Sequence, residues 1–262
     1  MSSEQDNLSR YERQMVFGPV GLAGQRLLAR KKAMVVGVGA LGSWSSQLLV
    51  RMGAGLVRLV DDDCVAMNNL HRQCLYTEND ALQAAPKVDA AARRLARFNS
   101  QARIEPVRQR LSAANILELA SGMDVILDGT DNFAARFLIN DYSVKYDVPW
   151  VFAGVVGAEA QIMSIVPGRT PCLRCISESP PPPCVDPSCR VAGVLGPAAA
   201  AVASVQAMEA AKILTGHADA VSPYLLKVDF WKNEYQRIDV SAACRDIDCP
   251  CCKQRHFEYL EA

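Results

Sequence analysis

Short apolar runs alternate with amphipathic stretches between residues 34 and 156. Runs rich in valine, leucine and isoleucine predict buried strands at 34–38, 56–60, 104–107, 123–127 and 150–156. Apolar residues at helical spacing predict helices after the first strand, from Pro86 onward and over Phe133–Tyr146. Because strands and helices keep alternating, we predict an α/β fold with a doubly wound, Rossmann-like, mostly parallel sheet.

The pattern changes beyond this alternating region. Four consecutive prolines, Pro180–Pro183, exclude a helix or a central strand there, and we predict a flexible crossover loop at 176–196. An alanine-rich helix is predicted over Pro197–Leu214. It is apolar on every face, so we expect it to be buried or to lie at an interface. Two further strands are predicted at 224–230 and 235–240.

Composition limits the number of domains and the kinds of partner. The 262 residues are 50% hydrophobic and 21% charged, which supports a single domain over 1–262. Within it we expect an N-terminal helical arm at 1–30 and a cysteine-rich tail at 244–262. Lysine plus arginine and aspartate plus glutamate both total 28, so no overall charge attracts nucleic acid or an anionic membrane.

The chain has no pattern of an export signal or a membrane span. Residues 1–10 are polar, and the longest apolar stretch, Val191–Met208, contains Gly193, Gly196 and Pro197. We therefore expect a cytoplasmic protein. Ten cysteines in a reducing compartment favour metal ligation or thiol chemistry over disulfides.

Two Cys-x-x-Cys pairs are candidates for a metal site. Cys172 pairs with Cys175 and Cys249 with Cys252, and two such pairs can complete a tetrahedral zinc site. Four thiolates leave no open position, so this zinc would be structural and the tail would be a zinc-binding tail. Cys251 competes for the fourth place, but the spacing of the first pair favours Cys252. The alternative is four buried thiols without a metal.

A glycine-rich turn predicts a nucleotide site. Gly37, Gly39 and Gly42 form the pattern G-x-G-x-x-G between a predicted strand and a predicted helix. There the backbone can approach a phosphate at the positive end of the helix. Asp61 ends the second strand about 20 residues later, where a carboxylate can accept hydrogen bonds from a ribose. A tight structural turn would need similar glycines, and the motif does not separate NAD, FAD and ATP.

Polar residues after later strands favour a phosphate ligand. Asn69 and Arg72 follow the second strand, and Lys87 begins a helix, where the helix dipole disfavours a cation unless an anion is also present. Asp131 follows another strand and can hold Mg²⁺ through oxygen ligands. Each has an ordinary alternative: Lys87 can be solvated and Arg72 can form a surface ion pair. Asp131 or Asn132 can cap the next helix.

Short sequence blocks follow one another in a specific order. Besides the glycine turn, they are Arg10–Gln14 (RYERQ), Asn69–Gln73 (NLHRQ), Pro86–Val88 (PKV), Asp128–Asn132 (DGTDN), Cys172–Cys175 (CLRC) and Cys249–Cys252 (CPCC). The ordered set resembles the ThiF/MoeB/HesA family of ubiquitin-activating-enzyme-like adenylyltransferases, and the resemblance covers almost the whole chain. Each block is weak alone, but their order is specific.

The resemblance implies a reaction. The C-terminal glycine carboxylate of a ubiquitin-like sulfur-carrier protein would attack the α-phosphorus of ATP and release pyrophosphate with Mg²⁺. The carboxylate is already ionised, so catalysis would rest on positioning and on charge stabilisation. The residue roles implied by the resemblance are ribose binding by Asp61, phosphate binding by Asn69, Arg72 and Lys87, and Mg²⁺ binding by Asp131.

The resemblance also implies roles for two residues outside the predicted sheet. Arg13 resembles an arginine that is supplied to the neighbouring subunit's site, which implies a homodimer. Cys189 stands where relatives carry a thiol that can bond to the activated carrier, and the neighbouring Arg190 can raise its thiolate fraction. An unreactive loop cysteine is an equal alternative. A sulfurtransferase or a cysteine desulfurase is a further candidate partner, and thiamine, molybdopterin and other sulfur pathways all stay open.

Three positions depart from the family pattern. Ala40 and Ala160 stand where many relatives carry glycine, and Ala85 where relatives often carry glutamine. We interpret these changes as differences in loop detail, which affect substrate choice and rate more than the reaction type.

Two other functions fit part of the sequence. An NAD- or FAD-dependent oxidoreductase would use the same glycine turn and Asp61, but it leaves the later charged residues unexplained. A non-catalytic module could keep the fold and bind a ubiquitin-like partner, although the retained charged residues argue against it. Binding of NAD in place of ATP with Mg²⁺ would distinguish the oxidoreductase from the adenylyltransferase. Pyrophosphate exchange would distinguish the adenylyltransferase from the non-catalytic module.

Overall fold

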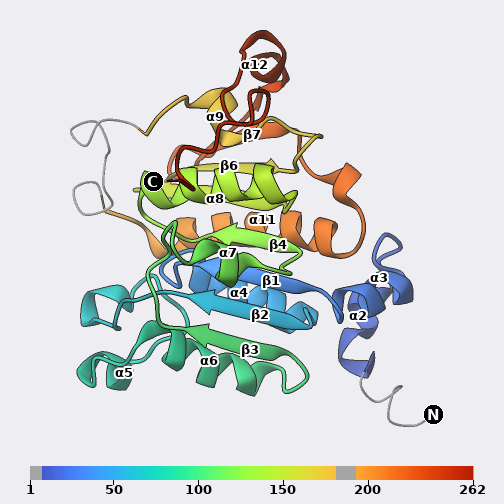
Figure 1. Ribbon diagram of the computed structural model, residues 1–262. Helices are drawn as coiled ribbons and strands as arrows, with labels where there is room; N and C mark the ends of the chain where they lie inside the picture. Colours follow the sequence, from blue (N-terminus) through green and yellow to red (C-terminus); the bar gives the residue numbers. More distant parts are fainter. Residues whose placement is uncertain (1–7, 181–192, 262) are drawn as a thin grey trace.

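One eight-stranded sheet organises residues 8–180 and 193–261, which the computed structural model describes (Figure 1). The strand order is β3-β2-β1-β4-β5-β6-β7-β8. Neighbours from β3 to β5 pair in parallel, and neighbours from β5 to β8 pair antiparallel. The strands are β1 Lys32–Val36, β2 Leu56–Val60, β3 Arg103–Val107, β4 Val125–Asp128, β5 Trp150–Val156, β6 Glu159–Ile165, β7 Tyr224–Asp229 and β8 Glu234–Asp239.

Helices connect the strands and extend the chain at both ends. The α-helices are α2 Glu12–Met15, α3 Gly21–Leu28, α4 Gly42–Met52, α5 Glu78–Leu82, α6 Lys87–Phe98, α7 Ile116–Ala120, α8 Phe133–Tyr146, α9 Leu173–Ile176, α11 Gly196–Leu214 and α12 Ser241–Asp246. Single turns of 3₁₀ helix are η1 Ser9–Tyr11, η2 Met67–Asn69 and η3 Ala218–Ala220.

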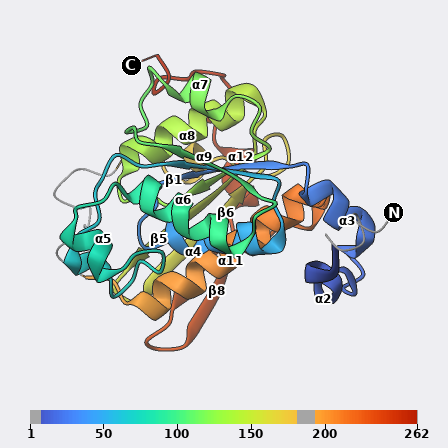
Figure 2. The same cartoon turned by 90° about the horizontal axis from the view of Figure 1, so that it is seen from below.

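The sheet has a separate hydrophobic core on each face (Figure 2). On one face α4, α6 and α11 pack against inward side chains such as Val35 and Leu127. On the other face α7 and α8 cover Ile126 and Trp150, and the cysteine-rich tail joins this second core. Side chains therefore alternate between two apolar layers, which explains why the parallel strands are continuous apolar runs.

The predicted parallel strands are confirmed, with small shifts at their ends. The first strand ends at Val36 and not at Val38, because Gly37 takes a left-handed backbone (φ +81°) that breaks the extended chain. The fourth begins at Val125, since the amide of Met123 bonds back to the Ala120 oxygen in a turn. Helix α8 has the predicted bounds.

One strand was missing from the prediction. Glu159, Ala160 and Gln161 belong to β6, which turns back from β5 through Gly157 (φ +61°). Ala160 pairs with Val155 and is buried, so the interpretation of this position as loop detail is wrong. The alternation of exposed Glu159 and Gln161 with Ala160 is the period of a strand that is covered on one face.

The alanine-rich helix α11 packs against α4, β4, β5 and β6. Pro197 lies in its first turn, where a missing N–H costs nothing. Ala199, Val202 and Ala203 are fully buried, whereas Ser204 and Met208 are exposed. The expected burial is therefore confirmed for most of the helix, with one exposed stripe.

The N-terminal arm and the segment after β6 are described only in part. The described part of the arm at 1–30 is helical, with α2 and α3. Residues 181–192, within the predicted crossover loop at 176–196, lie outside the described residues. After them the chain returns beside Gly157, whose amide donates to the Gly193 oxygen. No helix in the described ranges has the length and apolarity needed to cross a bilayer.

Candidate functional site

The predicted nucleotide residues meet at one edge of the sheet. Strand β1 lies between β2 and β4, and the chain passes from β1 to β2 and β3 on one side before it returns to β4 on the other. Gly37 follows β1, Asp61 follows β2, and the turn that carries Asp131 follows β4. Open α/β sheets bind ligands at such a point, where the strand order reverses.

The glycines of the turn fall into two groups: Gly37 and Gly42 allow close backbone packing, and Gly39 leaves open space. A Cβ on Gly42 would collide with the Gly37 oxygen, and a Cβ on Gly37 would lie 2.6 Å from the Gly129 oxygen. These two positions hold the backbone of β1, β4 and α4 together. A Cβ on Gly39 would meet its nearest neighbour, Gln73 Nε2, only at 3.8 Å. Gly39 therefore leaves room for a ligand to approach the main chain.

Asp61 shapes the glycine turn. Its carboxylate is buried and accepts hydrogen bonds from the amides of Val38 at 2.7 Å and Asp63 at 2.8 Å. Burial raises the pKa of Asp61, and the charge of Lys87 together with the backbone hydrogen bonds opposes this effect. The carboxylate is thus held in one orientation beside the turn before any ribose is present.

Lys87 is neither solvated nor unpaired. Its side chain is buried, and Nζ lies 2.7 Å from Asp63 Oδ2 and 3.9 Å from Asp61 Oδ2. These carboxylates supply the anionic charge that a cation at the start of α6 requires. The sequence reasoning missed Asp63, although the spacing Asp-x-Asp at the end of β2 was a signal for it.

Asn69 and Arg72 lie on the segment around η2 that packs beside the turn. Arg72 Nη1 donates to the Asn68 oxygen at 2.7 Å, and Asn69 Oδ1 accepts from the Ala66 amide at 3.1 Å. Trp44 of α4 donates its indole N–H to the Arg72 oxygen at 3.3 Å. The backbone at Arg72 is thereby tied to the first helix, while its guanidinium remains partly exposed.

Gln73, the next residue, was given no role from sequence. It is 4% exposed, and its Oε1 has no hydrogen-bond partner among the described residues. Its amide nitrogen faces the open position at Gly39. A buried amide that lacks a partner and borders the open glycine is a candidate ligand contact.

Asp131 is the exposed member of a rigid turn. It is solvent-exposed and forms no hydrogen bond or ion pair that involves the described residues, whereas Asn132 caps α8 by accepting the Ala135 amide at 2.9 Å. The capping alternative therefore applies to Asn132. Asp131 keeps both carboxylate oxygens available, which suits a hard cation such as Mg²⁺.

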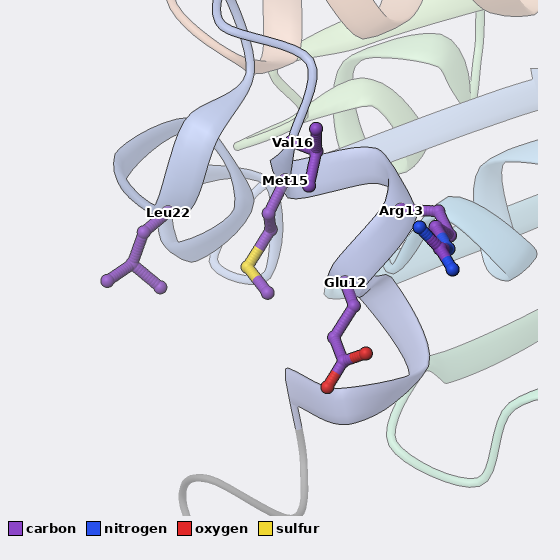
Figure 3. A pocket seen from close by; sticks show the side chains of 5 residues that line it. All are labelled: Glu12, Arg13, Met15, Val16 and Leu22. Atoms are coloured by element: carbon purple, nitrogen blue, oxygen red, sulfur yellow. The ribbon is translucent and has the colours of Figure 1, made fainter.

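Arg13 lies away from this edge. It is exposed on α2 and lines a cavity of about 520 Å³ with Glu12, Met15, Val16 and Leu22 (Figure 3). Figure 1 places α2 and α3 at the end of the sheet opposite to the loop that carries α5. The structure therefore does not bring Arg13 to the glycine turn of its own chain.

The four predicted cysteine ligands converge. The Sγ atoms of Cys172, Cys175, Cys249 and Cys252 all lie within 4.8 Å of one another. Contacts between them measure 3.8 Å for Cys172–Cys175, 3.6 Å for Cys172–Cys249 and 3.4 Å for Cys175–Cys252. A tetrahedral zinc with Zn–S bonds of about 2.3 Å separates its sulfurs by about 3.8 Å, so the cluster fits this ion. The hydrogen bond with Cys172 raises the pKa of Cys175, so four thiolates need a cation to coexist.

The competition between Cys251 and Cys252 is decided by orientation. Cys252 joins the cluster, whereas the buried Sγ of Cys251 accepts a hydrogen bond from Asn140 Nδ2 at 3.3 Å. Asn140 Oδ1 accepts the amide of Leu173, which lies between the first two cysteines, at 2.8 Å. One side chain of α8 therefore holds both cysteine turns in register, which no local spacing reveals.

Cys189, the candidate thiol for the carrier, lies outside the described residues. The structure therefore adds nothing to its predicted role.

Comparison with known proteins fits this geometry. A model of the ThiF family matches residues 11–251. The chain belongs to the ThiF family. A Bacillus subtilis relative, the sulfur carrier protein ThiS adenylyltransferase, is 39% identical over 251 residues, covering 96% of this chain and 73% of the relative. The sulfur carrier protein adenylyltransferase of Thermus thermophilus is 38% identical, covering 94% and 91%.

Other relatives of this ThiF-family chain support the same assignment. The SAMP-activating enzyme E1 of Haloferax volcanii is 33% identical and covers 100% of this chain and 94% of its own length. The solved structure of E. coli MccB with MccA-N7isoASN superposes with a TM-score of 0.78 at 20% identity, covering 94% of this chain and 74% of that one. At that identity the likeness concerns the fold alone.

Proposed function

We propose that this ThiF-family chain uses ATP to adenylylate the C-terminal Gly-Gly carboxylate of a ubiquitin-like sulfur-carrier protein. The observation that carries the proposal is the open position at Gly39, in a glycine turn whose Val38 amide is held by Asp61, which in turn lies 3.9 Å from Lys87. Two relatives are named adenylyltransferases of sulfur carrier proteins, and these names support the substrate class. They give no support to the oxidoreductase alternative.

The reaction moves an AMP group. A carboxylate oxygen of the carrier attacks the α-phosphorus of ATP, a new O–P bond forms, and the bond to the bridging oxygen of the β-phosphate breaks. Pyrophosphate leaves with its electrons. Charge builds on phosphate oxygens, so Lys87 and Arg72 act as fixed cations, and removal of one costs on the order of 10²-fold in rate. Mg²⁺ held by Asp131 would neutralise the polyphosphate charge.

The side chain of Lys87 is held in place by its neighbours before any phosphate binds. Asp63 holds its ammonium group at 2.7 Å, and the buried Asp61 lies 3.9 Å away, beside the turn that would receive the phosphates. Asp61 would accept the ribose hydroxyls with the lone pairs that its two amide contacts leave open. The amide nitrogen of Gln73 borders the open position at Gly39 as a further donor, and Asn69 would donate from the same segment of the chain.

The cysteine cluster would hold one structural zinc. It joins the tail to α9, which contacts α8, and its four sulfurs leave no position for a substrate. Zinc here stabilises the second core and takes no part in the transfer.

The working unit in this proposal is a symmetric homodimer. Arg13 is exposed beside Val16, Phe17 and Leu22, whose exposed fractions are 79%, 61% and 46%. Apolar side chains exposed in this way on one short arm indicate a surface that another chain covers. A second copy would bury them and bring Arg13 to the partner's phosphates, which a two-fold axis repeats at both sites.

Cys189 would act after adenylylation, when sulfur reaches the carrier from a sulfurtransferase or a cysteine desulfurase in the cytoplasm. Cys189→Ser is then expected to preserve pyrophosphate exchange and to impair sulfur transfer. Loss of exchange itself would assign Cys189 to substrate binding or to the fold.

Isotope exchange tests the central step. The protein, a Gly-Gly-terminated carrier and Mg²⁺ should incorporate labelled pyrophosphate into ATP, and omission of the carrier should abolish this exchange. Asp131→Ala should remove it, whereas Asp219→Ala, which alters an exposed aspartate in η3, should not. Exchange by wild type no faster than by Asp131→Ala, with a carrier shown to bind, contradicts the proposal.

A further inference from the structure

Arg136 is a buried arginine in the first turn of α8, only 8% exposed. Its Nε donates to Asp128 Oδ2 at 3.0 Å, and its Nη2 donates to the Thr130 oxygen at 3.0 Å. A third, longer contact of 3.5 Å joins Nη2 to the Ala153 oxygen on β5. One guanidinium thus bridges the end of β4, the turn after it and the neighbouring strand.

The other groups of this turn are fixed by Asp128. Its second oxygen, Oδ1, accepts both the amide of Thr130 at 2.9 Å and the Thr130 hydroxyl at 2.6 Å. Its main-chain oxygen accepts Gln206 Nε2 of α11 at 2.7 Å. Gly129 in the same turn packs directly against the backbone at Gly37. Between these anchored residues and the cap at Asn132, Asp131 alone is exposed and unpaired within the described chain.

We infer that Arg136 is a positioning residue of the nucleotide site: it fixes the turn from Asp128 to Asn132 so that Asp131 faces the bound Mg-nucleotide. The inference rests on the proposed function for the identity of the ligand. Arg136 is buried beneath the turn and bonded to protein oxygens, so it acts through Asp131 and does not touch the reacting atoms.

The chemistry of the pocket explains why an arginine is required. The guanidinium carbon lies 5.0 Å from the ring centre of Phe133 and 5.2 Å from that of Phe152, so a flat cation fits between two aromatic side chains. A lysine has a point charge, and its ammonium cannot reproduce the planar arrangement of donors. Buried ion pairs add little net stability because desolvation offsets the attraction, so the pair of Arg136 with Asp128 is explained better by geometry than by stability.

The test measures nucleotide binding with and without the metal, using a fluorescent ATP analogue. Partners that orient a metal ligand typically change metal affinity by about 10- to 100-fold when they are removed. For Arg136→Lys we therefore expect the Mg²⁺ concentration for half-maximal binding to rise about 10- to 100-fold. Binding of the analogue without Mg²⁺ should stay within about twofold of wild type, since the turn at Gly39 is intact.

Arg58→Lys is the matched control. Arg58 also uses three guanidinium nitrogens, two on Glu105 and one on the Leu119 oxygen, but it joins β2 to β3 and α7. The Arg58→Lys variant should therefore have a lower melting temperature than wild type and the same Mg²⁺ concentration for half-maximal binding. The double variant D128N/R136Q, which removes both charges and leaves no unpaired buried carboxylate, should show the same Mg²⁺ shift as Arg136→Lys.

The outcomes separate this inference from the proposed function. Folded Arg136→Lys and D128N/R136Q proteins with a wild-type Mg²⁺ requirement overturn the positioning role. An equal loss of binding with and without Mg²⁺ also overturns it, because Arg136 would then support the whole site. If wild type binds the analogue but Mg²⁺ has no effect, the inference fails while nucleotide binding stands. Wild type that binds no ATP analogue overturns the proposed function itself.

Discussion

The side-chain amide of Gln14 donates a hydrogen bond to the main-chain oxygen of Met52 at 3.0 Å. Met52 is the last residue of α4, and Gly42, which closes the glycine turn, is the first. The helix has 11 residues and is therefore about 16 Å long. Arg13, adjacent to Gln14, thus lies about one helix length from the glycine turn of its own chain.

This separation gives a prediction about the dimer. Arg13→Ala and Asp131→Ala should each be inactive in pyrophosphate exchange, and a mixture that exchanges subunits should regain activity. In a mixed dimer one site has both residues and the other lacks both, so random pairing restores about a quarter of all sites.

Subunit exchange itself provides the control, measured with differently tagged copies. If tagged subunits mix and activity stays at the level of the separate variants, Arg13 does not complete the site of a partner chain.

The orientation of the last two cysteines predicts a sharp contrast in zinc content. Cys252→Ser removes a cluster sulfur and should reduce zinc well below the one ion per chain expected of wild type. Cys251→Ser changes the adjacent residue, which faces Asn140, and should keep the zinc. Elemental analysis of protein purified without chelators measures both. Equal zinc in the two variants, or none in wild type, contradicts the assignment.

Ala84 offers a test of backbone strain beside the site. It has φ +44°, a left-handed conformation that follows the short helix α5 and favours glycine. Ala84→Gly should therefore raise the free energy of unfolding by about 0.5–1 kcal/mol, after allowance for the greater freedom of glycine in the unfolded chain. Ala81→Gly, inside α5, should lower it by about 1 kcal/mol. Urea unfolding of the two variants gives the comparison, and a loss of stability in both contradicts the strain argument.

Asp61 predicts a pH dependence of stability. Its ordinary pKa of 3.8 is raised in the folded protein, chiefly by burial. Between 3.8 and the raised value the unfolded chain has released the proton and the folded chain still holds it, so stability falls as pH rises through this window. The Asp61→Asn variant has no titrating carboxyl group at this position and therefore serves as the reference.

Relative to Asp61→Asn, wild type should therefore lose free energy of unfolding as pH rises from 3.8, and the difference should become constant above the folded pKa of Asp61. Denaturant titrations of both proteins between pH 3 and pH 8 measure it. A constant difference across this range contradicts the shifted pKa. Other titrating groups are common to both proteins and cancel.

Local rules account for the parts of the molecule that were predictable. The two apolar layers require continuous apolar runs in the parallel strands, so these runs could be recognised one at a time. Gly37 and Gly42 lie within one turn, and each Cys-x-x-Cys pair closes over four residues. Such features depend on the geometry of residues that are close in the sequence, so the sequence alone is enough to predict them.

Contacts between distant segments were decided by the tertiary structure. Asn140 donates to Cys251 across 111 positions of the chain, and Cys251 is not one of the four clustered cysteines. The partner of Lys87 at Asp63 and the β-strand at Ala160 likewise depend on neighbours brought in by folding. Pairing over such distances depends on which faces meet, and this is set by the packing of the whole sheet.

The sequence by itself thus determined the fold class, the glycine turn, the order of the charged residues and the four cysteines that cluster. Only the tertiary structure showed that Asp128 and Arg136 are the base of the turn and that Asp131 is its exposed member. The three residues lie in one short segment and carry similar polar character in the sequence. Asp128 and Arg136 are buried and Asp131 is exposed, and this difference gives them different roles. The burial results from the packing of α8 and β5 against the end of β4.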